Sequence, residues 1–124
     1  MMFYQFRSQE ERRASGSGQL LEFQYGVPGA DVLSLDAISF WKDDSLYLHH
    51  DDFAAFDVQY GKIIRDGTYD NRKTGPVDPC GINWFSSSLT TEIVRKLEAA
   101  GNTEPILLEW LKKAQANGFY ILGI

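Results

Sequence analysis

The last third of the chain, Gly81–Ile124, constrains the fold more than any other stretch. It contains the serine run Ser86–Ser88, and a serine hydroxyl can accept from the free N–H groups of a first helical turn. Apolar residues follow at helical spacing until Gly101, which suits the left-handed residue that ends many helices. The pattern predicts an amphipathic helix over Leu89–Ala100 with one buried stripe.

A second helix is predicted over Ile106–Ala116. Asn102 and Thr103 are typical N-cap residues, and Pro105 suits a first turn because its missing N–H would have no helical partner there. Gly118 provides a second signal for a helix end. Since only a short connection separates the two helices, we expect them to pack antiparallel.

An uninterrupted apolar run, Phe119–Ile124, follows the second helix. A run of this kind, too short for a helix of its own, is typical of a strand that is covered on both faces. A chain of 124 residues has room for one domain around one core. We therefore predict a single α+β domain, residues 1–124, with a mainly antiparallel sheet, two C-terminal helices packed on one face and a buried C-terminal strand.

The residues upstream must supply the rest of this sheet. Met2–Arg7 and Gln19–Tyr25 have the alternation and the residue types of strands. Between them, the Ser- and Gly-rich segment 8–18 is predicted to be a mobile loop. We interpret Ala37–His49 as a hairpin whose acidic tip is Asp43–Asp44.

Two further segments complete the middle of the chain. Asp51 or Asp52 is predicted to cap a short helix that buries Phe56 and Tyr60, because an acidic pair suits the positive end of a helix dipole. A strand is the alternative for the same residues, since their apolar side chains also alternate. Turn-forming and charged residues predominate over Arg65–Cys80, which we interpret as a surface loop of residues 65–80, and such loops often carry function.

The cysteine content and the N-terminal residues bear on the compartment. Cys80 is the single cysteine, so an internal disulfide cannot form. The first seven residues lack both a basic segment and a long apolar segment of a secretory signal. No apolar run approaches the roughly 18 residues of a membrane span. We expect a cytoplasmic protein that does not associate with membranes.

The net charge of −5 is concentrated in the middle of the chain. From Asp31 to Asp78 the sequence has ten Asp, no Glu and five Lys or Arg, whereas acidic and basic residues balance in the remainder. An acidic middle disfavours nucleic acid as a partner, since phosphate binding needs a basic face. It favours a basic partner or a cation.

The densest acidic group consists of Asp43, Asp44, Asp51, Asp52 and Asp57. One interpretation is a solvated face that aids solubility, as most runs of charge do. The other is a partner-binding surface that blocks a basic active-site groove. Complementary potential would then speed the encounter, and a few buried charge pairs would add affinity.

His49, His50, Asp51 and Asp52 form the one cluster of metal-ligand residue types in the sequence. Alternate residues of a strand share a face, so such a cluster offers two ligands on each side. A metal site would need a third ligand, and the chain has no other histidine. We expect turn histidines and a helix cap, with no metal and no cofactor. A small metal-dependent hydrolase that uses these four residues is the enzymatic alternative.

Cys80 is the other candidate for chemistry. It lies between Pro79 and Gly81, with no basic neighbour in the sequence to favour its thiolate. A cysteine nucleophile would need His49 or His50 within reach through the fold. We expect instead a small residue packed at the end of the loop, and no catalytic residue.

Three features of the last third resemble a family of small, uncharacterised bacterial proteins: the run Gly81-Ile82-Asn83-Trp84-Phe85-Ser86, the spacing of the two helices, and the segment Asn117–Ile124. Members carry Gly-Ile-Asn-aromatic-aromatic-Ser, two helices and Gly-Phe-Tyr-Ile-Leu-Gly-Ile. The resemblance implies no catalytic residue. In size and charge the chain is also similar to the immunity proteins encoded beside bacterial toxins.

Charge and resemblance together lead to one expected function. We expect a bacterial binding protein of immunity type, not an enzyme, that neutralises a basic effector such as a nuclease toxin through the acidic surface. The hydrolase described above is the first alternative. The second is a structural or oligomerising module without catalysis.

Overall fold

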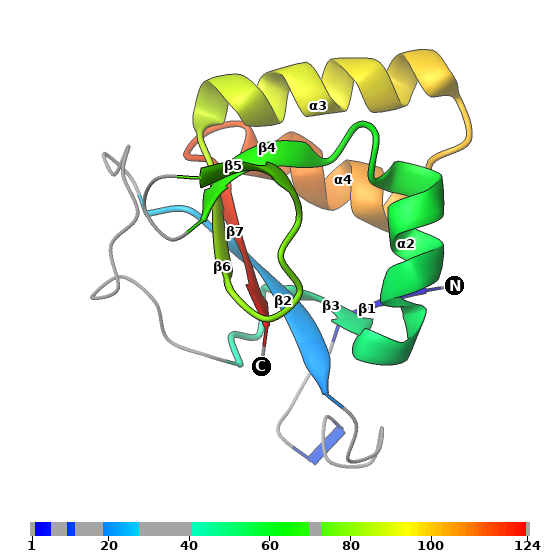
Figure 1. The fold of residues 1–124 in the computed structure, drawn as a ribbon, viewed down its shortest axis with the longest axis vertical. Coiled ribbons are helices and arrows are strands. Elements are labelled where there is room, and N and C mark those ends of the chain that lie inside the picture. The colour runs from blue at the N-terminus through cyan, green and yellow to red at the C-terminus, as the bar shows by residue number, and fades with distance from the viewer. Residues whose placement is uncertain (1, 6–9, 12–18, 28–40, 70–72, 124) are drawn as a thin grey trace.

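The computed structural model describes residues 2–5, 10–11, 19–27, 41–69 and 73–123. Seven strands in these residues form one antiparallel sheet, in the order β1-β3-β2-β7-β6-β4-β5 (Figure 1). The strands are β1 (Phe3–Tyr4), β2 (Leu20–Tyr25), β3 (Leu46–His49), β4 (Arg65–Tyr69), β5 (Lys73–Pro76), β6 (Ile82–Phe85) and β7 (Phe119–Gly123). The helical elements are the 3-10 turn η2 (His50–Asp52), α2 (Phe53–Tyr60), α3 (Ser87–Ala100) and α4 (Pro105–Ala114). The predicted α+β class is confirmed.

The predicted strand after the second helix lies in the interior of the sheet. β7 pairs with β2 along one edge and with β6 along the other, so that Ile121 is opposite both Phe23 and Asn83. The four residues from Phe119 to Leu122 are each at most 1% exposed. β7 therefore joins two halves of the sheet, β1-β3-β2 and β6-β4-β5. Ile124, the last residue of the predicted run, lies outside the described residues.

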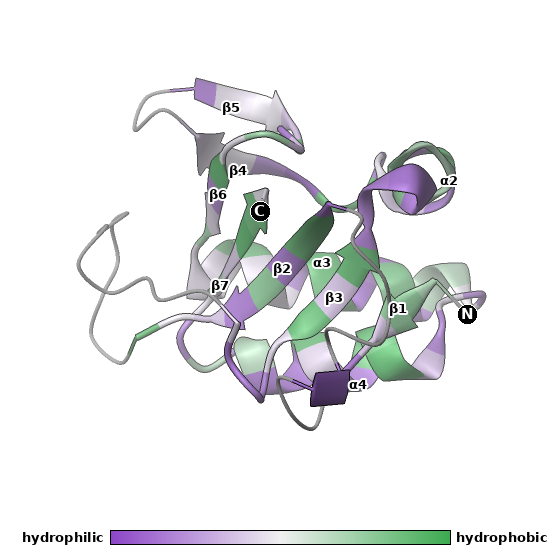
Figure 2. Cartoon of the chain, turned by 90° about the horizontal axis from the view of Figure 1, so that it is seen from below, coloured by the Kyte–Doolittle hydropathy of each residue, from purple (hydrophilic) through white to green (hydrophobic). Residues whose placement is uncertain are grey.

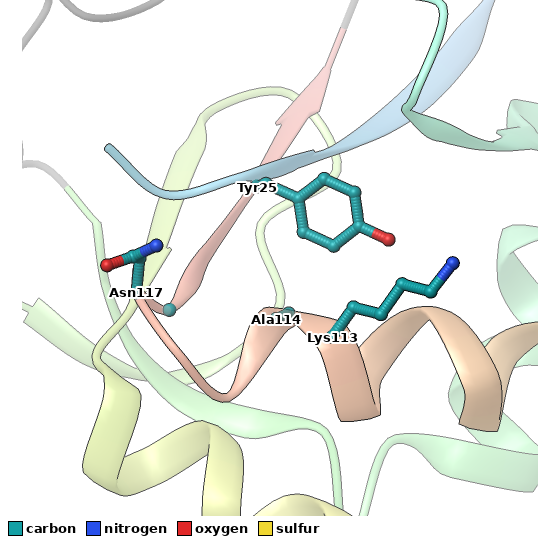
Figure 3. A pocket seen from close by; sticks show the side chains of 5 residues that line it. Tyr25, Lys113, Ala114 and Asn117 are labelled. Atoms are coloured by element: carbon teal, nitrogen blue, oxygen red, sulfur yellow. The ribbon is translucent and has the colours of Figure 1, made fainter. Parts of the chain in front are cut away.

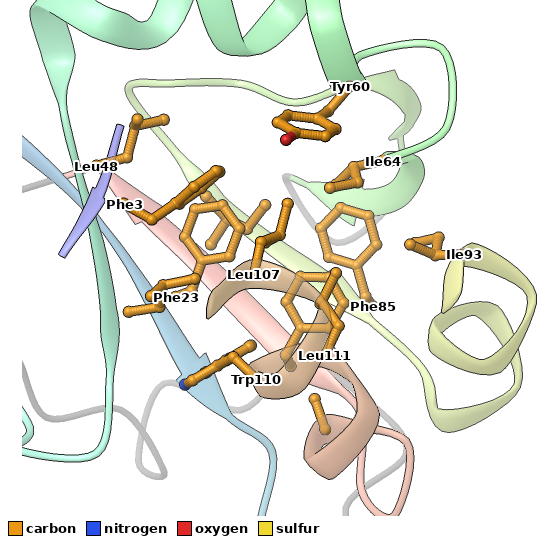
Figure 4. Close-up of a cluster of buried hydrophobic side chains, with 14 of the residues drawn as sticks. Phe3, Phe23, Leu48, Tyr60, Ile64, Phe85, Ile93, Leu107, Trp110 and Leu111 are labelled. Carbon is orange, nitrogen blue, oxygen red and sulfur yellow. The ribbon is translucent and has the colours of Figure 1, made fainter. Parts of the chain in front are cut away.

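The helices α2, α3 and α4 pack on the same face of the sheet (Figures 1 and 4). Their shared core contains the following buried side chains of the helices and strands: Phe3, Leu21, Phe23, Leu46, Leu48, Phe56, Tyr60, Phe85, Ile93, Val94, Leu97, Leu107, Trp110, Leu111, Phe119 and Ile121. Each large apolar side chain that leaves water in this way contributes about 1.5–3 kcal/mol. The two C-terminal helices, α3 and α4, thus pack on one face as predicted.

The second face of the sheet is buried as well. Leu20 and Tyr47 form one cluster on it, and Trp84, Tyr120 and Leu122 form another. Figure 2 shows apolar residues alternating with more hydrophilic ones along β2 and β3. The alternation in β7 places Ile121 in the helix-covered core and its neighbours on the second face, which is why the whole strand is apolar.

α3 ends at Ala100 as predicted, and it begins at Ser87, inside the serine run but two residues before the predicted first helical residue Leu89. The hydroxyl of Ser86 accepts from the N–H of Leu89 at 3.2 Å, and Gly101 ends the helix in the left-handed region with φ of 78°. The hydroxyl of Thr103 donates to the carbonyl of Leu97 at 3.3 Å. Thr103 therefore closes α3 and does not cap α4.

The start of α4 differs from the prediction by one residue. Glu104 occupies the N-cap position, without a side-chain hydrogen bond, and Pro105 is the first helical residue. The helix ends at Ala114, two residues before the predicted end, and a turn leads to Gly118 at φ of 78°. A Cβ on Gly118 would lie 2.2 Å from the carbonyl oxygen of Phe85, so this close passage needs glycine.

The predicted surface loop over residues 65–80 is wrong, because most of it forms the β4–β5 hairpin at the edge of the sheet. Backbone pairing stabilises this hairpin, and Thr68 also pairs with Trp84 of β6. Asp66-Gly67, a pair of residue types common in turns, lies at a register shift within β4. A Cβ on Gly67 would lie 2.8 Å from the Phe85 ring, so glycine lets this ring fit beneath the strand.

Other predictions near the N-terminus are met in part. Of the predicted strand Met2–Arg7, only Phe3–Tyr4 form a strand, β1, and residues 6–7 lie outside the described residues. The predicted mobile loop 8–18 also lies outside them, except for residues 10–11. Residues 37–40 of the predicted hairpin Ala37–His49 also lie outside them. Its acidic turn is present, but β3 pairs with β2 and β1.

The short helix predicted after the acidic pair is confirmed as α2, with Phe56 and Tyr60 buried. Asp52 occupies the predicted N-cap position of α2, but its side chain does not cap the helix, because Asp51 and Asp52 belong to the 3-10 turn η2. In the part of the chain that the structure describes, no helix has the length and apolar character needed to cross a membrane.

Candidate functional site

The structure divides the five acidic residues into two groups at opposite ends of β3. Asp43–Asp44 form the turn before this strand, whereas Asp51–Asp52 lie in η2 after it and Asp57 lies on α2. A strand of four residues spans about 13 Å. All five are exposed except Asp52, which is half-buried, and none forms an ion pair with another described residue.

A buried carboxylate holds the first of these groups, the Asp43–Asp44 turn. Glu22 is 0% exposed, and its side chain accepts from the backbone N–H groups of Trp41 at 2.8 Å and of Lys42 at 3.0 Å. It also accepts from the hydroxyl of Ser45 at 2.7 Å. These donors lie on both sides of the turn, so Glu22 fixes its backbone against β2. Together with a longer hydrogen bond from the Tyr47 hydroxyl at 3.3 Å, these contacts replace the water that a buried carboxylate loses.

A second contact ties the same turn to α4. The indole Nε1–H of Trp110 donates to the carbonyl oxygen of Asp44 at 2.9 Å. The Trp110 ring stacks on the ring of Tyr25, with centroids 4.2 Å apart and planes inclined by 16°. Tyr25 is the last residue of β2 and is half-buried. The acidic turn, the end of β2 and the middle of α4 therefore meet at one aromatic pair.

This environment changes the acidity of the Tyr25 hydroxyl. Burial, with the negative charge of Asp44 as a second cause, raises the pKa of Tyr25 from 10.0 to about 12. Both causes disfavour the phenolate. Tyr25 therefore presents a neutral ring with a protonated hydroxyl across the physiological pH range.

Two adjoining pockets open beside Tyr25, and we call them together the Tyr25 groove. The larger, of about 290 Å³, is lined by Gln5, Tyr25, Pro105, Ile106, Glu109, Trp110 and Lys113. The smaller, of about 220 Å³, is lined by Tyr25, Lys113, Ala114, Asn117 and Gly118. Figure 3 shows the smaller pocket between β2 and α4, where the Tyr25 ring and the Lys113 side chain extend to the same side. Tyr25 and Lys113 line both pockets.

Sequence reasoning missed this groove. Its strongest signal, the alternation of Leu21, Phe23 and Tyr25, placed Tyr25 on the buried face of β2. Nothing in the sequence pairs Tyr25 with Trp110, which follows far along the chain. The exposed Glu109 and Lys113 also look like ordinary surface residues of α4.

The candidate metal cluster is held by other contacts. The His49 ring meets the Tyr4 ring edge-on at 5.2 Å, and the backbone N–H of His50 donates to the carbonyl of Gln19 at 2.9 Å. Among the described residues no three His, Cys, Asp or Glu side chains are placed to share a metal ion. Within that part of the chain the hydrolase alternative has no third ligand.

Cys80 does not pack at the end of a loop, contrary to the expectation. Its side chain is exposed in the turn between β5 and β6, and its backbone N–H donates to the Asp78 carboxylate at 3.0 Å. The hydrogen bond involves only the backbone of Cys80, and the thiol is exposed to solvent.

Comparison with known proteins adds no relative. No protein-family model matches the chain. No curated protein and no solved structure matches it significantly. The resemblance of the Gly81–Ser86 run and its following helices to a bacterial family therefore stays a prediction.

Proposed function

We propose that this chain is a binding protein of immunity type that neutralises a basic effector, such as a nuclease toxin, through its acidic surface. The supporting observation is the Asp43–Asp44 turn. It exposes two carboxylates that have no ion pair with a described residue, on a backbone held by Glu22 and Trp110. Because the turn is already ordered, binding costs little backbone entropy there.

The charge of this surface defines the class of partner. Exposed carboxylates attract a basic surface over about a Debye length, which raises the association rate at low salt. The second acidic group, Asp51, Asp52 and Asp57, adds to the same negative field. A standard interface covers about 800 Å² of each partner, roughly 30 Å across, which exceeds the length of β3. The separation along β3 alone does not divide the acidic surface into two interfaces.

The first test neutralises the turn. Partners are captured from the source cell with the parent and with the double variant Asp43→Asn/Asp44→Asn, and association rates are compared at low and high salt. We expect the variant to associate more slowly, with a weaker salt dependence, because charges at an interface rim act chiefly on the encounter. Its free energy of unfolding should change by no more than about 0.5 kcal/mol, since both side chains are exposed.

A matched control separates the turn from net charge. The variant Glu92→Gln/Glu98→Gln removes the same charge from α3, where both carboxylates belong to surface ion pairs of little energetic weight. It should keep most of the parent's association rate. If the parent and the Asp43→Asn/Asp44→Asn variant bind a partner equally at every ionic strength, the turn is only a solvated face. Neutralisation itself is tested by co-expressing the captured partner, whose toxicity the parent should suppress.

A further inference from the structure

The larger pocket of the Tyr25 groove has the size of one side chain. It lies between the end of β2 and the first two turns of α4, and its volume is about 290 Å³. Pockets for drug-sized small molecules usually start near 300 Å³ and extend to about 1,000 Å³. The pocket is therefore at the lower limit for such ligands, and a single long side chain is a better fit.

The aromatic wall of this pocket is held in place before any ligand binds. Trp110 is 3% exposed, and the rings of Phe23 and Phe119 meet its ring edge-on at 6.1 Å and 5.8 Å. With its indole N–H on the Asp44 carbonyl, Trp110 supports the stacked ring of Tyr25. A fixed π-surface of this kind attracts planar cations.

The charges around the pocket favour a cation. Glu109 is exposed and lines it, and Asp44 is close enough that its charge contributes to the raised pKa of Tyr25. Asp43 is the exposed neighbour of Asp44. The opposing charge is Lys113, which also lines the pocket one helical turn after Glu109. No ion pair joins Lys113 to another described residue, so its flexible stem is free to move aside.

We infer that the larger pocket of the Tyr25 groove receives an arginine side chain of the basic partner. Its guanidinium lies on the Tyr25 ring and forms two parallel hydrogen bonds with the Glu109 carboxylate, and its aliphatic stem packs on Pro105 and Ile106. Arginine fits better than lysine because its planar guanidinium both stacks and binds a carboxylate through two N–H groups. This inference rests on the proposed function, since it names the part of the partner that the acidic surface receives.

The test uses a small probe and needs no partner. N-acetyl-arginine amide is titrated into the protein while NMR follows the Trp110 indole N–H and the Tyr25 ring resonances. We expect saturable shifts at these two residues. N-acetyl-lysine amide should bind more weakly, and the neutral isostere N-acetyl-citrulline amide should not shift either residue at the same concentration.

Variants of the pocket wall test the two contacts separately. Tyr25→Leu should weaken binding of the arginine probe by about three- to fivefold, whereas Tyr25→Phe, which keeps the ring, should retain it. Glu109→Gln should weaken binding by about three- to tenfold. Glu98→Gln on α3 is the matched control and should leave it unchanged, since Glu98 lies outside the pocket.

Replacing Lys113 should change the binding affinity in opposite directions for a cation and for an anion. If the pocket receives a cation, Lys113→Gln removes a repelling charge and should strengthen binding of the arginine probe. Weaker binding in that variant, together with saturable shifts from N-acetyl-glutamate amide, would identify an anion site and overturn the inference.

The probe and the partner experiments fail independently. If association with a basic partner depends on Asp43 and Asp44 while the arginine probe leaves Trp110 and Tyr25 unshifted, the arginine site is wrong and the proposed function stands. The opposite result is that the probe binds with the expected dependence on Glu109 while the association rate with the captured partner does not depend on Asp43 and Asp44. The pocket is then supported and the proposed acidic interface is wrong.

Discussion

At the scale of single residues, the buried Glu22 carboxylate fixes the backbone of the Asp43–Asp44 turn. Replacing it with alanine leaves the N–H groups of Trp41 and Lys42 and the Ser45 hydroxyl without their acceptor. Buried donors that lose an acceptor cost about 1–3 kcal/mol each. We expect Glu22→Ala to lower the free energy of unfolding by about 2–5 kcal/mol, measured by urea unfolding.

Glu22→Gln provides the comparison, because its amide keeps one carbonyl acceptor in place of two carboxylate oxygens. Its loss of stability should be smaller than that of Glu22→Ala. An alanine variant as stable as the parent would show that the turn does not depend on this carboxylate.

Tyr25 gives a prediction in alkaline solution. Burial, and then the charge of Asp44, raise its pKa from 10.0 to about 12, so the folded protein keeps a proton that the unfolded chain loses. The contribution of this proton to stability is complete below pH 10 and is lost as the pH rises to about 12. Asp44→Asn should move the pKa of Tyr25 downward, whereas Asp43→Asn should leave it in place. NMR titration of the Tyr25 ring, with Tyr25→Phe for assignment, measures both.

These two residues also show what the sequence could not predict. Glu22 alternates with Leu21 and Phe23, a pattern that in a sheet with one buried face would place it in solvent. The second face is buried too, and the donors of Glu22 come from about twenty residues further along the chain. Local alternation placed Tyr25 on the core-facing side of β2 but contains no information on such distant partners.

At the scale of elements, β7 should be indispensable. Deleting Phe119–Ile124 removes four side chains that are at most 1% exposed, and each contributes about 1.5–3 kcal/mol. Total stability is only about 5–15 kcal/mol. We expect the truncated chain to show no cooperative thermal transition by circular dichroism.

Point variants make the same test in a chain that can still fold. Ile121→Ala should lower the free energy of unfolding by about 2–5 kcal/mol, since its side chain is 0% exposed. Thr91→Ala on the exposed side of α3 is the control and should change it by less than about 0.5 kcal/mol. A cooperative, folded protein without Phe119–Ile124 would contradict the role of β7.

The elements differ in how well the sequence predicted them, for a physical reason. α3 was predicted from the serine run Ser86–Ser88 and from Gly101, because both helix ends depend on nearby residues. The β4–β5 hairpin was missed because it buries few side chains and depends on backbone ladders. Gly67, one of the turn-forming residues of that segment, lies against the Phe85 ring of another strand, where a Cβ would not fit.

At the scale of the whole molecule, the two buried faces should unfold together. Ile121 belongs to the helix-covered core and its neighbour Leu122 to the cluster on the second face. We expect one transition, with circular dichroism and tryptophan fluorescence giving the same midpoint. Leu122→Ala should lower both midpoints equally, although Leu122 lies on the face away from the helices. Separate midpoints would show that the faces are independent units.

The candidate site also belongs to this scale, which limited its prediction. The sequence grouped five aspartates as one surface because they are close in the chain, yet β3 separates them into two groups. The groove needs β2, α4 and the turn before β3 at one place. Composition predicted that the surface is acidic. Only the fold showed that Tyr25 and Trp110 lie beside the acidic turn.

The position of β7 in the sheet has a consequence for biosynthesis. Of the seven described strands it is the last to leave the ribosome, yet it alone links β1-β3-β2 to β6-β4-β5. Until it emerges, β2 and β6 each expose an edge of unpaired N–H and C=O groups, and such edges recruit other chains. Pairing of Tyr25 with Phe119 must close a long loop, which slows folding. The yield of folded protein in a cell should therefore depend on how well the nascent chain is kept apart from other chains until β7 has paired.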